Sequence, residues 1–444
     1  MKTLRILGVG AIMVMIAAAA VIAWFAFGPG PMSFASGPRT TLAAYQAEAP
    51  TGVPTSLRSP SLVGKGQYLT QAADCAACHT TKGGEPFAGG RAFKLPFGTL
   101  YSPNITPDVA TGIGKYTDAD FLKAVHRGIA RDGKRLYPAF PYAAYSMLSD
   151  EDVLAIKAYL FSLKPVSATP PPNTLAFPFN QRWLMAIWGL LFNPDKRFEP
   201  VTGQTPQWNR GAYLVEAAGH CGDCHTPRNL MQAVDNRHKF AGGNADGWNA
   251  YNISGDRLTG IGAWTPQEIA HYLAYGHAGG RGTANGPMAE VVEKSLSHLT
   301  PEDIAAMAAY LKSVPPIHSV SLPDTLAAAA PSRHDAGYNL NPRGKQIFEG
   351  SCASCHAWNG SGALSDRAQL TGSRAVNDPS AANVAQMVLE GTGHAAGGRP
   401  FMPGFAAAYT DTEIASVANY VTARFGSAPS HVTREQVAKM RLQR

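Results

Sequence analysis

The sequence predicts an all-α protein built from three tandem units with long loops, preceded by an apolar helix at the N-terminus. Three observations support this prediction. One pattern, Cys-x-x-Cys-His, occurs three times among the 444 residues. Helix-forming segments flank each copy, and 45 glycines and 33 prolines interrupt the rest of the chain. At about 150 residues per domain, this length also accommodates three domains.

The predicted boundaries follow the chain in order. We expect a signal peptide or N-terminal membrane anchor over 1–28, a linker over 29–58, the first unit over 59–170, a connector over 171–204, the second unit over 205–316, a linker over 317–338, the third unit over 339–426 and a basic tail over 427–444.

The N-terminal residues predict export across a membrane. Lys2 and Arg5 precede an uncharged apolar stretch over 7–27, which ends at Gly28. This stretch is long enough to cross a bilayer, whereas a cleaved signal peptide usually has a core of about 7–15 apolar residues. We favour a retained anchor over a cleaved signal. Either form would leave the bulk of the chain on the periplasmic face of the inner (cytoplasmic) membrane.

Each unit contains one copy of the repeated motif, and the three copies use all six cysteines. They are Cys75 and Cys78 with His79, Cys221 and Cys224 with His225, and Cys352 and Cys355 with His356. This pattern is typical of c-type haem attachment, in which both thiols bond to the haem and the histidine binds iron. Zinc is the alternative, but zinc motifs place a second pair of ligands within about 12–20 residues, far closer than these motifs lie. The sequence therefore predicts three covalently bound haem c groups.

A short helix with a glycine and an aromatic residue is predicted before each motif. Glycine allows a second helix to cross closely, and we expect the aromatic side chains of Tyr68, Tyr213 and Phe348 to pack toward the haem edge. The three segments span residues 64–69, 209–214 and 343–348.

A second helix is predicted to close each unit. Each begins with a Ser or Thr followed by acidic residues, which is the signal of an N-cap. The three cap residues are Ser149, Thr300 and Thr410. One further apolar segment, 183–192, is too short to span a bilayer. It could dock on a partner or the membrane surface, or pack between the units.

An electron-carrying haem needs a second fixed iron ligand, and methionine is the usual partner of histidine. In the third unit, Met402 lies in a proline-flanked loop and is preferred to Met387, which lies in a helix-like stretch. In the second unit, Met288 is preferred to Met231 and Met307, which lie too near the motif or inside the closing helix.

The first unit differs from this pattern. The position that corresponds to Met402 holds Phe140, and Met147 is the only methionine in the unit. We therefore assign Met147 as the ligand. His126 could substitute, although a helical histidine before an arginine more often has a structural role. An unfilled site would instead leave an iron able to bind small molecules.

The charge pattern does not indicate nucleic-acid binding, because the 38 Lys and Arg residues are scattered and the net charge is only +7. No set of residues suggests a nucleophile or an acid–base pair, and we assign no catalytic residue.

Three further segments of the first unit belong to a recognisable pattern together with the three motifs. They are the Asn-Ile-Thr-Pro-Asp segment at 104–108, the loop over 136–142 and the helix over 155–160. Over residues 59–426 the chain resembles the trihaem cytochrome c subunit of bacterial membrane-bound dehydrogenases, the alcohol, gluconate, fructose and sorbitol types. It lacks the amphipathic C-terminal tail of several relatives. The resemblance implies three class I cytochrome c-like domains.

The resemblance also implies an electron relay. Electrons would pass from a dehydrogenase catalytic subunit, which holds flavin, pyrroloquinoline quinone (PQQ) or molybdenum, through the haems to ubiquinone or a terminal oxidase of the respiratory chain. Two alternatives stay open: a haem enzyme of the peroxidase or reductase type with an open iron site in the first unit, and a free-standing electron shuttle.

Overall fold

The computed structural model describes residues 28–58, 60–319, 341–392 and 401–442, together with Met13, residues 15–17 and Ala20. The predicted N-terminal apolar helix therefore lies almost entirely outside the described residues. Within the described part of the chain, no helix is both long enough and apolar enough to cross a membrane.

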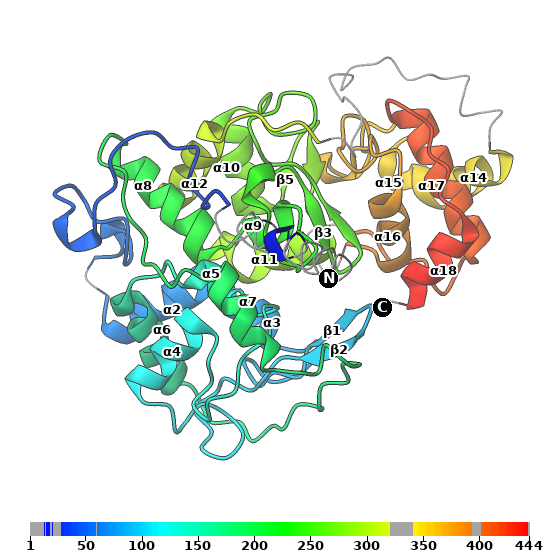
Figure 1. Ribbon diagram of the computed structural model, residues 1–444. Coiled ribbons are helices and arrows are strands. Elements are labelled where there is room, and N and C mark those ends of the chain that lie inside the picture. Colours follow the sequence, from blue (N-terminus) through cyan, green and yellow to red (C-terminus); the bar gives the residue numbers. More distant parts are fainter. Residues whose placement is uncertain are drawn as a thin grey trace, which may run out of the picture.

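The described chain is mostly helical, as Figure 1 shows. The first unit contains α2 (Leu62–Ala72), α3 (Cys75–His79), β1 (Ala92–Leu95), β2 (Gly98–Tyr101), α4 (Asp118–Arg127), α5 (Tyr142–Tyr145) and α6 (Asp150–Ser162), and the connector contains α7 (Leu184–Phe192). The second unit contains α8 (Pro206–Ala212), a π-helix (Tyr213–Ala218), α9 (Gly222–His225), β3 (Gly243–Ala245), β4 (Trp248–Ala250), α10 (Pro266–Tyr275), β5 (His277–Ala278), β6 (Gly282–Thr283), α11 (Gly286–Lys294) and α12 (Pro301–Ser313). The third unit contains α14 (Pro342–Ile347), a π-helix (Phe348–Cys352), α15 (Ala353–His356), α16 (Ala382–Glu390) and α17 (Asp411–Phe425), followed by α18 (Arg434–Leu442).

Among the residues that the structure describes, three short antiparallel hairpins depart from the predicted all-α class. They pair β1 with β2, β3 with β4, and β5 with β6, with Ala92 opposite Tyr101, Gly243 opposite Ala250 and His277 opposite Thr283. Each strand has two to four residues. Such strands are too short to show a clear alternation of apolar and polar residues in the sequence.

The same helix crossing occurs three times, as the glycines predict. Helix α2 crosses α6, α8 crosses α12, and α14 crosses α17. A Cβ atom on Gly66, Gly211 or Gly344 would lie 1.9, 2.0 or 2.2 Å from a backbone oxygen of the crossing helix. Only glycine allows this approach, so the same close crossing recurs in each of the three units.

The predicted N-caps of the closing helices are confirmed. The Ser149 side chain accepts a hydrogen bond from Asp152 N, Thr300 accepts one from Asp303 N, and Thr410 accepts one from Glu413 N. Acidic residues in the first turn then face the positive end of each helix dipole.

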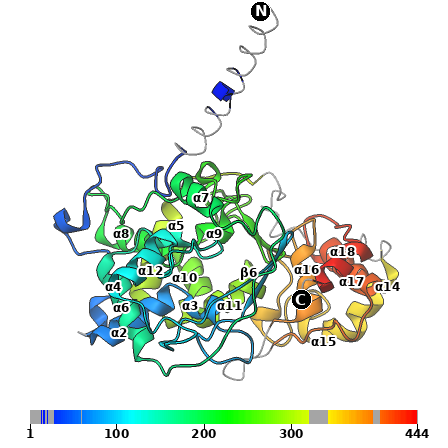
Figure 2. The same cartoon turned by 60° about the horizontal axis from the view of Figure 1, so that its bottom comes forward.

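The first and second units share one hydrophobic core, whereas the third has its own. Figure 2 shows the third unit, α14 to α18, lying to one side of the body formed by the other two. Part of the predicted basic tail forms α18, which packs on α17 with Val437 fully buried.

Tyr68 and Tyr213 join the first two units reciprocally. The Tyr68 hydroxyl of the first unit donates to Asp303 Oδ2 of the second at 2.6 Å, and the Tyr213 hydroxyl of the second donates to Asp152 Oδ2 of the first at 2.6 Å. Neither tyrosine is among the residues that line the two cavities beside the motifs, so the prediction that they pack toward the haem edge is wrong. The aromatic side chains instead satisfy buried carboxylates across the boundary between the units.

The connector helix α7 packs through one side only. Trp188 is buried against Tyr142, and its indole nitrogen donates to Met231 O at 2.9 Å. Trp183, Ile187 and Leu190 remain exposed.

Candidate haem sites

Each Cys-x-x-Cys-His motif forms a short turn of helix, in α3, in α9 with Cys221 as its cap, and in α15 with Cys352 as its cap. All six cysteines are free thiols. In the first two units the turn lies against a cavity lined by both cysteines and the histidine, of about 430 Å³ around His79 and about 330 Å³ around His225. The structure therefore brings the predicted thiols and histidine of these two motifs to one apolar cavity each.

All three motif histidines are oriented in the same way. His79 Nδ1 donates to Pro103 O at 2.8 Å, His225 Nδ1 to Tyr251 O at 2.6 Å, and His356 Nδ1 to Ala368 O at 2.6 Å. Because Nδ1 carries the proton, Nε2 has a free lone pair for a metal ion, and the carbonyl fixes the orientation of the ring. Burial lowers the pKa of each histidine and favours this neutral form.

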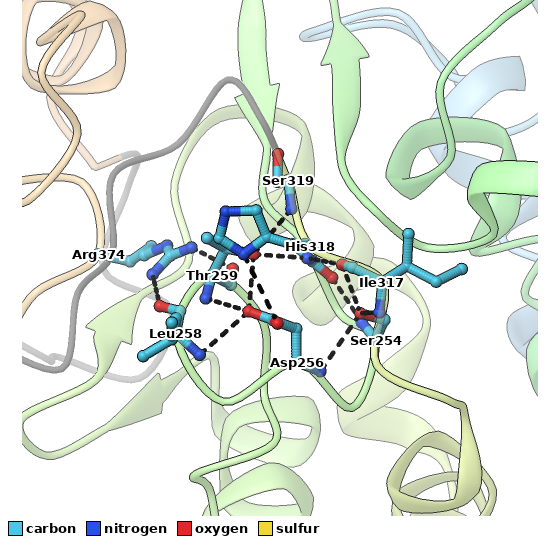
Figure 3. A network of polar contacts seen from close by, with 9 residues as sticks. Ser254, Asp256, Leu258, Thr259, Ile317, His318, Ser319 and Arg374 are labelled. Atoms are coloured by element: carbon cyan, nitrogen blue, oxygen red, sulfur yellow. Dashed lines mark hydrogen bonds and ion pairs between the residues drawn. The ribbon is translucent and has the colours of Figure 1, made fainter.

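A repeated loop presents two of these carbonyls. Asn104, which follows Pro103, donates through Nδ2 to Thr111 Oγ1 at 3.0 Å, and Asn252, which follows Tyr251, donates to Thr259 Oγ1 at 2.9 Å. Figure 3 shows the second loop, in which Asp256 accepts from Thr259 and Leu258. The Asn-Ile-Thr-Pro-Asp segment and its counterpart thus hold the carbonyl that orients the motif histidine.

The motif thiols of the first two units are neutral. Burial raises the pKa of Cys75, Cys78, Cys221 and Cys224 to about 12, so each thiol is neutral at pH 7. Covalent attachment to haem would convert them to thioethers, which are neutral as well. No cluster of three or more His, Cys, Asp or Glu side chains suited to a metal ion occurs among the described residues.

Known proteins share this pattern over most of the chain. The cytochrome c family model matches residues 63–164 and 342–424. The gluconate 2-dehydrogenase cytochrome c subunit of Pantoea cypripedii is 40% identical over 402 residues, which cover 86% of this chain and 90% of that protein. The fructose dehydrogenase cytochrome subunit of Gluconobacter japonicus is 37% identical, with 89% and 86% covered. The quinone-type alcohol dehydrogenase cytochrome c subunit of Gluconobacter oxydans is 35% identical, with 86% and 82% covered.

The chain belongs to this family of cytochrome c subunits. Membership implies covalently bound haem c and electron transfer by the bound haem, and the cavities and oriented histidines fit that cofactor. When bound, haem supplies an iron that changes its oxidation state. The motif cysteines would be the attachment thiols and the motif histidines would bind the iron, and the first two units each provide an apolar cavity for the group.

The predicted sixth ligand of the first unit of this cytochrome does not reach the cavity. Met147 is buried in the shared core, and neither it nor His126 is among the residues that line the cavity around His79. Phe140 does line it. His126 is buried with its Nδ1 3.7 Å from Asp150 Oδ1, and burial lowers its pKa to about 4. The assignment of Met147 stays a prediction.

The second unit brings two methionines to its cavity. Met288, at the start of α11, lines the cavity together with His225, as required of the predicted ligand. Met387 of α16 lines the same cavity from the third unit. A methionine placed by a distant unit could not be found by searching between a motif and its own closing helix.

In the third unit, Met402 packs against the core cluster that Cys352 also contacts. Its position is fixed by Thr392, because Met402 N donates to Thr392 Oγ1 at 2.9 Å and Thr392 N donates to Met402 O at 3.0 Å. The ligand roles of Met288 and Met402 also stay predictions.

Sequence reasoning missed two ionisable residues of the haem sites. Asp74 is buried beside Cys75 and lines both cavities, its Oδ1 has no hydrogen-bond partner, and burial raises its pKa to about 8. Arg374 of the third unit lines the cavity of the second. Asp74 precedes a motif directly and could have been noted, whereas nothing in the sequence links Arg374 to a motif more than a hundred residues away.

Proposed function

We propose that this cytochrome carries three haem c groups on three class I cytochrome c-like domains, over 59–170, 205–316 and 339–426. The shared orientation of His79, His225 and His356 is the observation that carries the proposal. The three equivalent helix crossings support it, including the one in the middle unit, which the family model does not cover.

The haems would relay electrons from the catalytic subunit of a dehydrogenase. The similar proteins are named as cytochrome subunits of gluconate, fructose and alcohol dehydrogenases, which supports a partner of that class. The partner would hold flavin, PQQ or molybdenum and would oxidise the substrate. Ubiquinone or a terminal oxidase would receive the electrons.

The proposed location is the periplasmic face of the inner membrane. The uncharged apolar stretch over 7–27 supports it. The exposed apolar side chains of Ile187 and Leu190 on α7, and of its N-cap residue Trp183, are compatible with contact with a membrane surface.

Two measurements test the proposal. The intact mass of the mature protein should exceed the mass of the chain by three haems, and loss of a haem should follow replacement of both cysteines of any motif. Affinity purification from the native membrane should recover a dehydrogenase subunit. A mass with fewer than three haems would contradict the relay, and recovery of the cytochrome alone would favour a free shuttle.

One observation supports a second candidate function. The described residues that line the cavity of the first unit include Phe140 and no methionine. An iron there with an open position would bind small molecules and could support peroxidase or reductase chemistry. A high-spin haem that binds cyanide in the native protein would support this candidate. Three low-spin haems, one of which becomes high-spin in Met147→Ala, would support the relay and the Met147 assignment.

A further inference from the structure

Asp74 lies between the haem cavities of the first two units. It directly precedes Cys75. Among the described residues, it alone lines both the cavity around His79 and the cavity around His225. Only 6% of its surface is exposed. One buried carboxyl therefore borders two haem sites.

The segments that lead into the two motifs meet at this residue. The Tyr145 hydroxyl donates to Ala73 O at 2.6 Å, and the Tyr145 ring lies 5.4 Å from the ring of His220, the residue before the second motif. Tyr145 lines the first cavity and His220 lines the second. Helix α11 of the second unit also packs on α3 (Figure 2). The position of Asp74 is thus fixed by contacts between the units.

The local backbone does not use the Asp74 carboxyl. Asp74 is the N-cap residue of α3, but its side chain makes no capping hydrogen bond. Its Oδ1 atom is buried without a hydrogen-bond partner, an arrangement that costs stability. The φ angle of 50° lies in the left-handed region, which Asp and Asn adopt more readily than most other residues. A capping role therefore does not explain the carboxyl.

The charged neighbours of Asp74 are paired with one another. Arg91 and Lys294 both bind Glu290, each at 2.5 Å, and Arg91 also lies 3.7 Å from Asp246. Burial and then the charge of Glu290 raise the pKa of Asp74 to about 8, against the opposing effects of Lys294 and Arg91. The carboxyl therefore changes its charge close to neutral pH.

The other titratable groups around Asp74 are Cys75 and Cys78 on its own helix, Tyr145 on α5 and His220. Burial raises the pKa of both thiols to about 12 and that of Tyr145 well above its usual value, so these groups are neutral at pH 7. His220 Nδ1 donates to Ala218 O at 3.1 Å.

A negative charge beside a haem stabilises the oxidised iron, which carries one more positive charge than the reduced iron. The effect is larger in a protein interior than in water, because the interior screens charge less. We propose that Asp74 is an electrostatic residue shared by the first two haem sites, whose carboxylate charge lowers the potentials of both haems together. This inference rests on the proposed function, because it requires a haem in each cavity.

The test compares Asp74→Asn with a control, Asp246→Asn. Asparagine keeps the size of the side chain and tolerates the left-handed conformation. Asp246 acts on Cys78 and Cys224, one thiol of each motif, but its side chain is half exposed and it lines neither cavity. The three midpoint potentials of each mature holoprotein are measured by redox titration over a range of pH, after the haem count is checked by mass.

Two of the three native potentials should fall together as the pH rises through about 8, because the Asp74 carboxyl then ionises. Asp74→Asn should remove this fall from both, so that both potentials exceed the native values above pH 8 and approach them at lower pH. Asp246→Asn should shift the potentials less, because solvent screens an exposed charge.

The inference is overturned if Asp74→Asn changes one potential or none, or if Asp246→Asn shifts the same two potentials equally. If Asp74→Asn does not mature, Asp74→Gly decides by the same comparison, since glycine also adopts the left-handed conformation. The native protein decides on its own if no two of its potentials share a pH-dependent fall, which would also overturn the inference. Fewer than three haems in the native protein would instead contradict the proposed function.

Discussion

The crossing of α2 and α6 predicts a sharp difference between two glycines of one helix. A Cβ atom on Gly66 would lie 1.9 Å from Ala155 O and 2.8 Å from Tyr159 Cβ, so the helices must separate by about 1 Å in Gly66→Ala. A Cβ atom on Gly64 would lie no closer than 3.3 Å to any atom, that atom being Pro60 Cβ. The first substitution therefore forces backbone to move, whereas the second does not.

The magnitudes follow from the two opposing effects. Alanine stabilises a helix by about 1 kcal/mol relative to glycine. Overpacking costs about 1–3 kcal/mol, and the cost reaches or exceeds the upper value when the added atom meets backbone, which cannot move aside as a side chain can. Gly66→Ala should lose about 2 kcal/mol of unfolding free energy, and Gly64→Ala should be neutral or slightly stabilising. A loss of about 1 kcal/mol lowers the midpoint temperature of thermal unfolding by about 2–4 °C, so the midpoint of Gly66→Ala should fall by about 4–8 °C.

Thermal unfolding followed by circular dichroism and by haem absorbance would measure this difference. Because α2 leads directly into the Cys75 motif, both signals should change at the lower temperature in Gly66→Ala. Equal midpoints for the two variants would refute the close crossing, and with it the argument that the three glycines mark a structural repeat.

Two further predictions concern buried charges. Arg210→Met should lower the free energy of unfolding by about 3–5 kcal/mol, because it leaves the buried Asp303 carboxylate, which Arg210 binds at 2.7 Å, without its cation. Arg343→Met, at the equivalent but exposed position, should change the denaturation midpoint little. Burial and Arg197 lower the pKa of His126 from 6.5 to about 4, against the opposing effects of Asp150 and Asp195. Above pH 6.5 His126 is neutral in both the folded and the unfolded chain, and its contribution to the free energy of unfolding is fully present. As the pH falls from 6.5 to about 4, the unfolded chain binds the proton first, and the free energy of unfolding falls by at most roughly 3 kcal/mol. Urea denaturation across this range should show the loss in the native protein and a smaller loss in His126→Gln.

Local patterns predicted the features that depend on local interactions. The N-caps at Ser149, Thr300 and Thr410 use a side chain and a backbone group three residues apart. The crossing glycines Gly66, Gly211 and Gly344 precede the first cysteine of their motifs by 9, 10 and 8 residues. These features can be read from the sequence because each is determined within one helix or one repeat.

Contacts between units could not be predicted in the same way. Tyr68 lies on the buried face of α2, but its partner Asp303 is 235 residues away, and no pattern near Tyr68 distinguishes a carboxylate in the next unit from a haem edge. Met387 and Arg374 reach the cavity of another unit for the same reason. The sequence identifies which side chains are suited to a haem site, but the packing of the units decides which site each one joins.

The reciprocal Tyr–Asp contacts have a consequence for cooperativity. Tyr68 and Tyr213 each complete the hydrogen bonding of an acid in the opposite half, so neither half can open without exposing an unpaired group in the other. The first two units should therefore melt as a single foldon, while the third, with a separate core, can open on its own. An early local opening of the third unit would expose the cavity of the second to solvent and leave the first still protected.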